Sequence, residues 1–534
     1  MSTPTSASRS VRQIASAAGI VGAATLASRT LGFVRDMAFA WLFGTGMVAD
    51  AFFAAFRIPS TLRELLGEGA LSAACTPAFT RTATREGRAA TWNLVSKVLG
   101  TLLVILAAVT GIGVLCAPWI VHVIAYGFAA VPGKLPLTVT LLRIMFPYIF
   151  LVGCAALFMA VLNAFGHFVA PALSPVVLNI VIITAAVGIS PRSAHPALVI
   201  AVAVLAGGVG QLAIQLPAAW RFGWRPMLRF APTDPAVREI GRLMLPGVGG
   251  LAVTQLNVLV GTLLASLLPE GNVAAMTYAF RLVQFPIGVV GVAIATGALP
   301  VMAAAVARDT MPDLTRALAA SLRMAVFLTL PAMVGLIVFR VPIVAVLFER
   351  GAFGRSATVL TSWILAAYAI GLLFYVVNRI LAPAFYSLND TWSPVATGVI
   401  SITVNIVASL ILMPYWGAVG IGLATALASS VNCAQLLVRL RRRIGPIGGT
   451  AILRGAGKAA IASCAIVAWG LLAQHTLQAP LALSRVVLLV AQLAIAAGLF
   501  ATAARLLRCE ELRWLLQVLR NRPAARIDKA PQIR

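Results

Sequence analysis

Long apolar runs recur along the whole chain, and they restrict its fold more than any other feature. Hydrophobic residues make up 60% and charged residues 10% of the 534 positions, whereas a soluble domain carries about 25% charged residues. A run of roughly 20 apolar residues can cross a bilayer as a helix. The sequence is therefore predicted to form an all-α polytopic membrane protein. Its predicted spans, about fourteen in number, lie at residues 19–43, 50–79, 93–118, 138–163, 171–190, 197–219, 242–268, 272–302, 319–340, 358–386, 393–413, 417–438, 456–475 and 484–507.

Two pairs of segments indicate an internal repeat. Residues 46–59 (GMVADAFFAAFRIP) resemble residues 271–286 (GNVAAMTYAFRLVQFP), and residues 196–221 resemble residues 417–442 at a similar offset. Because each half contains an even number of spans, both halves insert in the same orientation. Parallel repeats of this kind are typical of transporters with a cavity between two lobes. We predict two six-helix lobes around a central cavity, followed by two helices outside the repeat.

The positions of lysine and arginine divide the chain further. They are concentrated in alternate loops, as the positive-inside rule requires, so both termini are predicted to be cytoplasmic. The net charge of +26 is assigned to this topology, and nucleic acid is not a predicted partner. We expect no cleaved signal peptide. The predicted parts are a cytoplasmic tail at 1–18, an N-lobe at 19–222, a basic linker at 223–241, a C-lobe at 242–440, a basic linker at 441–455, helices 13 and 14 at 456–507, and a basic cytoplasmic tail at 508–534.

One apolar stretch near the N-terminus is unusually rich in charge. An intramembrane charge costs about 2.5–3.5 kcal/mol, so such residues usually face a wet cavity and mark a functional site. Arg281 lies in a later span with no acidic residue within ten positions, and is predicted to be unpaired and suited to an anionic ligand. A purely structural role, as Arg–carboxylate links between the lobes, stays open as an alternative. The charged residues of the stretch are Arg29, Arg35, Asp36, Asp50, Arg57, Arg63, Glu64 and Glu68.

Catalytic and metal-binding patterns are absent from the sequence. The six cysteines and four histidines are scattered, and no CxxC pair, nucleophile motif or phosphate-binding loop occurs in a suitable context. We therefore predict no enzyme activity, no cofactor and no metal. If transport is coupled to an ion, Asp36 and Asp50 are the candidate carboxylates.

The charged stretch also resembles a known family. Residues 31–74 (LGFVRDMAFAWLFGTGMVADAFFAAFRIPSTLRELLGEGALSAA) are similar to the N-terminal signature of the MurJ (MviN) lipid II flippases, of the multidrug/oligosaccharidyl-lipid/polysaccharide exporter superfamily. Residues 281–300, 146–149 and 381–390 also look like that family. The resemblance implies fourteen helices in two lobes. It also implies movement of lipid-linked peptidoglycan precursor (lipid II) from the cytoplasmic to the periplasmic leaflet by alternating access.

The resemblance also suggests roles for individual residues. It departs from the family at Phe280 and Gln284, where members often carry an acid, so any coupling role of those acids does not carry over. The expected substrate-binding residues are Arg29, Arg35, Arg63 and Arg281, and the expected cavity or coupling residues are Asp36, Asp50, Glu68 and Arg57.

The implied setting is cell-wall biogenesis and cell shape at the bacterial inner membrane. Lipid II and the bilayer are the expected partners, together with proteins of cell-wall synthesis or division. The lipid tail is expected to stay in the bilayer or in a groove formed with helices 13 and 14. Two alternatives remain: an ion-coupled exporter of small molecules or polysaccharide lipids from the same superfamily, and a non-transporting membrane scaffold for cell-wall synthesis.

Overall fold

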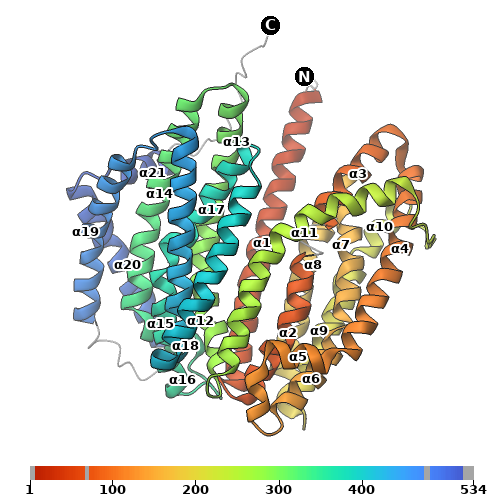
Figure 1. Ribbon diagram of the computed structural model, residues 1–534, viewed down its shortest axis with the longest axis horizontal. Coiled ribbons are helices and arrows are strands. Elements are labelled where there is room, and N and C mark those ends of the chain that lie inside the picture. Colours follow the sequence, from red (N-terminus) through yellow and green to blue (C-terminus); the bar gives the residue numbers. More distant parts are fainter. Residues whose placement is uncertain (1–5, 66–70, 474–481, 521–534) are drawn as a thin grey trace. The chain divides into compact units, whose positions relative to one another are not determined.

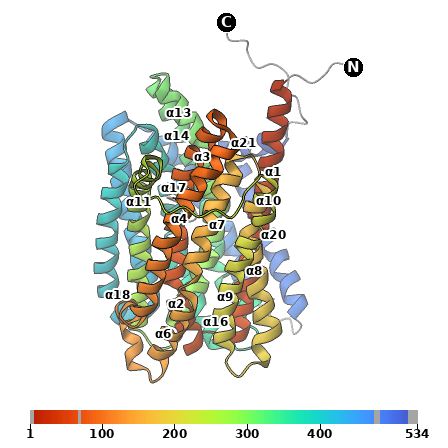
Figure 2. The ribbon, with the colours of Figure 1, turned by 90° about the vertical axis from the view of Figure 1, so that its right-hand side faces the viewer.

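The computed structural model describes residues 6–65, 71–473 and 482–520, which form helices joined by turns, with no strand among them (Figures 1 and 2). Helices are expected because a backbone in lipid has no water to bond and must satisfy its N–H and C=O groups internally. Every predicted span falls mainly on helical residues wherever the structure describes it. The prediction of an all-α membrane protein is confirmed.

The chain divides into two compact units, each built from more than one segment. The first contains residues 1–281, 347–361 and 405–421, and the second contains residues 282–346, 362–404 and 422–534. The first unit begins with helices α1 (Ser6–Phe43), α2 (Met47–Arg63), α3 (Leu71–Arg85), α4 (Gly87–Leu115), α5 (Ala117–Ile124), η2 (Tyr126–Ala130), α6 (Lys134–Met145), α7 (Tyr148–Ala164), α8 (Val169–Thr184), η3 (Ala185–Ile189), η4 (Ser190–Arg192), α9 (Pro196–Ala213), α10 (Leu216–Arg221), α11 (Pro235–Ser266) and most of α12 (Asn272–Pro286).

The remaining helices lie in the second unit or cross between the segments of the two. They are η5 (Ile287–Gly291), α13 (Val292–Ala307), α14 (Met311–Val338), α15 (Arg340–Phe348), α16 (Arg355–Ile370), α17 (Leu372–Ser387), α18 (Trp392–Ile444), α19 (Gly449–Ala473), α20 (Ala482–Leu506) and α21 (Glu510–Arg520).

Within the described residues, nine helices are long and apolar enough to cross a membrane, or ten if α16 and α17, which meet at a bend of 43°, form one span. The other predicted spans lie on α1, which carries the first part of the charged stretch, on α2 and α3, on α11, and on α18. Helix α18 contains two predicted spans because it reverses at Gly417, whose φ of +54° is left-handed. Ser401 then donates a hydrogen bond to the carbonyl of Ala428 at 2.8 Å, as expected for a helical hairpin.

Both predicted tails contain helix. Helix α1 already begins at Ser6, because residues 6–18 lack proline and glycine and can continue the helix. Helix α21 occupies residues 510–520 of the predicted C-terminal tail. Glu510 and Glu511 in its first turn stabilise the helix, because acidic side chains interact favourably with the positive end of the helix dipole. The lobe boundaries at 222 and 242 stay a prediction. The compact units divide the chain differently, with the first continuous segment ending at Arg281.

Candidate functional site

Three of the predicted residues meet around one buried carboxylate in the first unit. Asp36 on α1 accepts hydrogen bonds from Nη2 of Arg35 at 2.8 Å and from Nε of Arg281, on α12, at 2.6 Å. The Asp36 side chain is 5% exposed, whereas 40% of the Arg281 side chain remains exposed. We call Arg35, Asp36 and Arg281 the Asp36 cluster. With two guanidinium groups and one carboxylate it carries one net positive charge inside an apolar unit.

Helix α8 holds the Asp36 cluster from a third direction. Nη1 of Arg35 donates to Oδ1 of Asn179 at 3.3 Å, and Nδ2 of Asn179 donates to the carbonyl of Ser28 at 3.1 Å. These bonds fix the Arg35 guanidinium between α1 and α8, so one arginine is held in place. Arg281, in contrast, keeps enough exposed surface to meet a ligand.

The other predicted arginines do not join this cluster. Arg29 is exposed and lies on α1, two turns before Asp36. Arg63 at the end of α2 lies 3.8 Å from Glu64, and Glu64 in turn accepts a hydrogen bond from Gln255 of α11 at 2.5 Å. Arg57 is half-buried. Glu68 lies outside the described residues, so its predicted role stays a prediction.

A second buried carboxylate forms a separate cluster at the start of α2. Asp50 accepts a hydrogen bond from Nζ of Lys134 at 2.8 Å, and the two side chains are 1% and 2% exposed. Its oxygens also accept the backbone N–H groups of Gly271 at 2.7 Å and Ala274 at 2.8 Å. The Lys134 ammonium lies 4.1 Å from the centre of the Phe128 ring. Asp50 therefore joins α2, α6 and α12.

Gly271 has a conformation that this arrangement requires. Its φ of +92° is left-handed, and a Cβ there would lie 2.3 Å from the carbonyl oxygen of Thr45. Only glycine fits without strain. Gly46 precedes α2 in the first member of the predicted repeat, but its φ of −80° does not require glycine.

One face of helix α12 contributes residues to both clusters. Ala274, Tyr278 and Arg281 are spaced by about one turn each, so they lie on the same side of the helix. The hydroxyl of Tyr278 donates to the carbonyl of Gly44 at 3.2 Å, and its ring packs edge-on against Phe53 at 5.3 Å between centroids. The buried ring of Tyr278 separates the Asp36 cluster from the Asp50 pair.

The structure corrects one sequence inference and adds one residue. Arg281 was predicted to be unpaired because no acid is near it in sequence, but its partner Asp36 lies 245 positions away. Lys134 was not predicted, because it lies in a connection between predicted spans, where a charge carries no membrane cost. A lysine between apolar segments was the available signal. Among the described residues, no group of three or more histidine, cysteine or acidic side chains could hold a metal ion.

A helical protein with many apolar spans belongs to the class of polytopic membrane proteins. A family model described as "Lipid II flippase MurJ" matches residues 39–492. The chain belongs to this MurJ family.

Individual relatives agree with this assignment. The chain is 38% identical over 426 residues to a Vibrio cholerae protein named "Probable lipid II flippase MurJ", covering 78% of this chain and 81% of the relative. Its fold is similar to a solved "Lipid II flippase MurJ, inward closed conformation", with a TM-score of 0.75 and 24% identity over 91% of this chain and 99% of that one. A multidrug resistance MATE family transporter of the MOP superfamily has a TM-score of 0.68 and 16% identity, covering 79% of this chain and 96% of the other. The predicted family is confirmed.

Proposed function

We propose that this protein is a lipid II flippase, which moves the lipid-linked peptidoglycan precursor from the cytoplasmic to the periplasmic leaflet. Membership of the MurJ family supports this function. The observation that carries it is the Asp36 cluster, because it keeps one net positive charge and the Arg281 side chain is 40% exposed. A guanidinium pairs well with phosphate oxygens through two parallel hydrogen bonds, and the head group of lipid II is joined to its tail by a pyrophosphate.

The geometry suggests how the cluster handles its substrate. Asp36 accepts a hydrogen bond from Nε of Arg281, and the exposed part of the Arg281 side chain leaves room for an anion. The carboxylate therefore orients Arg281 without neutralising both arginines. Arg29 and Arg63 complete the proposed substrate-binding set, and Arg57 and Glu68 belong to the proposed cavity. Asp36 and Asp50 are the proposed coupling carboxylates, and each of them is bonded to a basic side chain that would respond to its protonation.

The transport cycle and setting are part of the same proposal. The site opens by alternating access, first to the cytoplasm and then to the periplasm, and no chemical bond is made or broken. Both termini are cytoplasmic in a bacterial inner membrane. Helices α19 and α20 offer a surface for the lipid tail, and proteins of cell-wall synthesis or division are its proposed partners. A potential that is negative inside favours outward movement of an anion by about 2.3 kcal/mol per charge per 100 mV.

Depletion of the protein in its native cells tests this function. We expect lipid II to accumulate in the cytoplasmic leaflet, as measured with a probe that reaches only the periplasmic one. The wild-type gene and an Arg308→Ala control, which removes an exposed arginine at the end of α13, should restore the distribution. Arg281→Ala should not, although the variant reaches the membrane. An unchanged distribution on depletion would contradict the proposal and favour an exporter of another substrate.

A further inference from the structure

The connection between α10 and α11 is bound tightly along α4. Nε1 of Trp92 donates to the carbonyl of Phe222 at 2.9 Å, and the backbone N–H of Arg229 donates to the carbonyl of Ser96 at 3.2 Å. A Cβ at Gly100 would lie 2.5 Å from the carbonyl oxygen of Arg229, so the two backbones are in close contact. The path of this segment is thereby fixed.

This fixed segment holds large apolar side chains away from the protein. Met227 is 48%, Leu228 63% and Phe230 63% exposed. They alternate with Arg225 and Arg229, both of which are exposed. Apolar side chains interleaved with arginine are characteristic of segments that lie in the boundary between lipid headgroups and acyl chains. We call residues 225–230 the interfacial segment.

The position of the interfacial segment on α4 agrees with that depth. The segment crosses α4 at Ser96 and Gly100. The exposed apolar face of α4 begins at Val104, at 51% exposure, and continues to Ile112, at 62%. One turn of helix, about 5.4 Å, separates Gly100 from this exposed apolar face. The interfacial segment therefore lies beside the start of an exposed apolar surface on α4.

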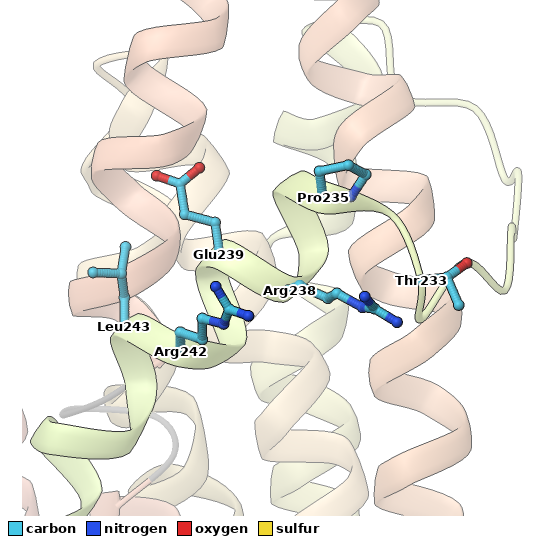
Figure 3. Close-up of a pocket in the computed structure, with 6 residues that line it drawn as sticks. All are labelled: Thr233, Pro235, Arg238, Glu239, Arg242 and Leu243. Carbon is cyan, nitrogen blue, oxygen red and sulfur yellow. The ribbon is translucent and has the colours of Figure 1, made fainter.

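A basic pocket lies just beyond the segment, at the start of α11. It has a volume of about 450 Å³ and is shown in Figure 3. Arg238 and Arg242 extend from adjacent turns of α11, while Glu239 points away from them (Figure 3) and bonds Arg81 at 3.0 Å. Like charges four residues apart destabilise a helix, so an anion between these two arginines would be favourable. The pocket is lined by Thr233, Pro235, Arg238, Glu239, Arg242 and Leu243.

We propose that this surface binds the headgroup of an anionic phospholipid from the bilayer around the protein. Arg238 and Arg242 take the phosphate, and the apolar side chains of the interfacial segment enter the acyl boundary beside it. The inference is independent of the transported substrate. The predicted basic linker at 223–241, whose charge was assigned to topology alone, would thereby also bind lipid.

Lipid retention by the full-length protein tests the headgroup site. The protein is extracted from nanodiscs of equimolar phosphatidylglycerol and phosphatidylcholine, and the bound lipids are identified by native mass spectrometry. We expect preferential retention of phosphatidylglycerol, reduced about thirtyfold in the double variant Arg238→Gln/Arg242→Gln, since each arginine near an anionic surface is worth about a fivefold change.

Arg441→Gln/Arg442→Gln is the matched control. It removes the same charge from an exposed basic cluster at the end of α18, and it should retain the preference of the wild type. An equal loss in both variants would mean general electrostatic attraction, and no loss in the Arg238 and Arg242 variant would mean that the pocket holds no lipid. Either result overturns the proposal.

Oxidation of methionine by hydroxyl radicals tests, without any substitution, whether the apolar side chains of the interfacial segment enter the acyl boundary. Met311, at the start of α14, is 36% exposed, less than Met227 at 48%, and Met302 is fully buried. In nanodiscs we expect Met311 to be oxidised rapidly and Met227 to be protected nearly as well as Met302. Oxidation of Met227 at the rate of Met311 would place the interfacial segment in water and refute the proposal.

Discussion

Replacing Lys134 with methionine tests the account of the buried pair most sharply. Methionine keeps most of the volume of the side chain and removes its charge, so the Asp50 carboxylate would keep only its bonds to the N–H groups of Gly271 and Ala274. Because the two side chains are 1% and 2% exposed, the stranded charge gains little from solvent. Breaking a buried pair in this way costs about 3–5 kcal/mol. The loss can be measured by equilibrium unfolding in mixed micelles, followed by tryptophan fluorescence.

Lys97 provides the matched control for this measurement. It bonds Asp234 at 2.6 Å, but the two side chains are 29% and 17% exposed, so Lys97→Met should cost only about 1 kcal/mol or less. Adding Asp50→Asn to Lys134→Met should recover part of the stability, because the amide leaves no buried charge. If Lys134→Met were no more destabilising than Lys97→Met, the reasoning about burial would be wrong.

Two further predictions concern single contacts in the first unit. Gly271→Ala should lower stability by about 1–3 kcal/mol, because alanine is strained at a φ of +92° and its Cβ would meet the carbonyl oxygen of Thr45; unchanged unfolding of this variant would contradict the close contact. The hydrogen bond from Lys97 lowers the pKa of Asp234, so the pair contributes fully to stability at neutral pH and loses its contribution as the pH falls below about 4. The stability difference between wild type and Asp234→Asn should therefore shrink in acid, and a difference that grows there would reverse the assigned sign.

Much of the fold could be predicted because the bilayer imposes it. Apolar runs must form helices in lipid, and the runs at 93–118 and 319–340, for example, lie mostly on α4 and α14. The break in α18 was predicted as the gap between the spans at 393–413 and 417–438, but the residue that makes it, Gly417, escapes hydropathy because it is one glycine among the 44 in the chain. Residues that continue a helix beyond the apolar core, as at the start of α1, also escape an argument based on hydropathy.

The candidate site could be predicted as a set of residues but not as a set of pairs. The cost of intramembrane charge identified Asp36, Asp50 and Arg281. It could not show that Asp36 bonds Arg281 across 245 positions, or that Asp50 bonds a lysine from outside the predicted spans. Pairing depends on tertiary packing, and a single sequence contains no direct record of it.

Flipping by the purified protein tests the central claim most directly. The protein is reconstituted into liposomes that contain fluorescent lipid II, and a membrane-impermeant quencher reports the fraction in the outer leaflet over time. Wild-type protein and Arg308→Ala should equilibrate lipid II between the leaflets, whereas Arg281→Ala should match protein-free liposomes. Equal flipping by Arg281→Ala and wild type would contradict the role of the Asp36 cluster, and no flipping by wild type would contradict the proposed function itself.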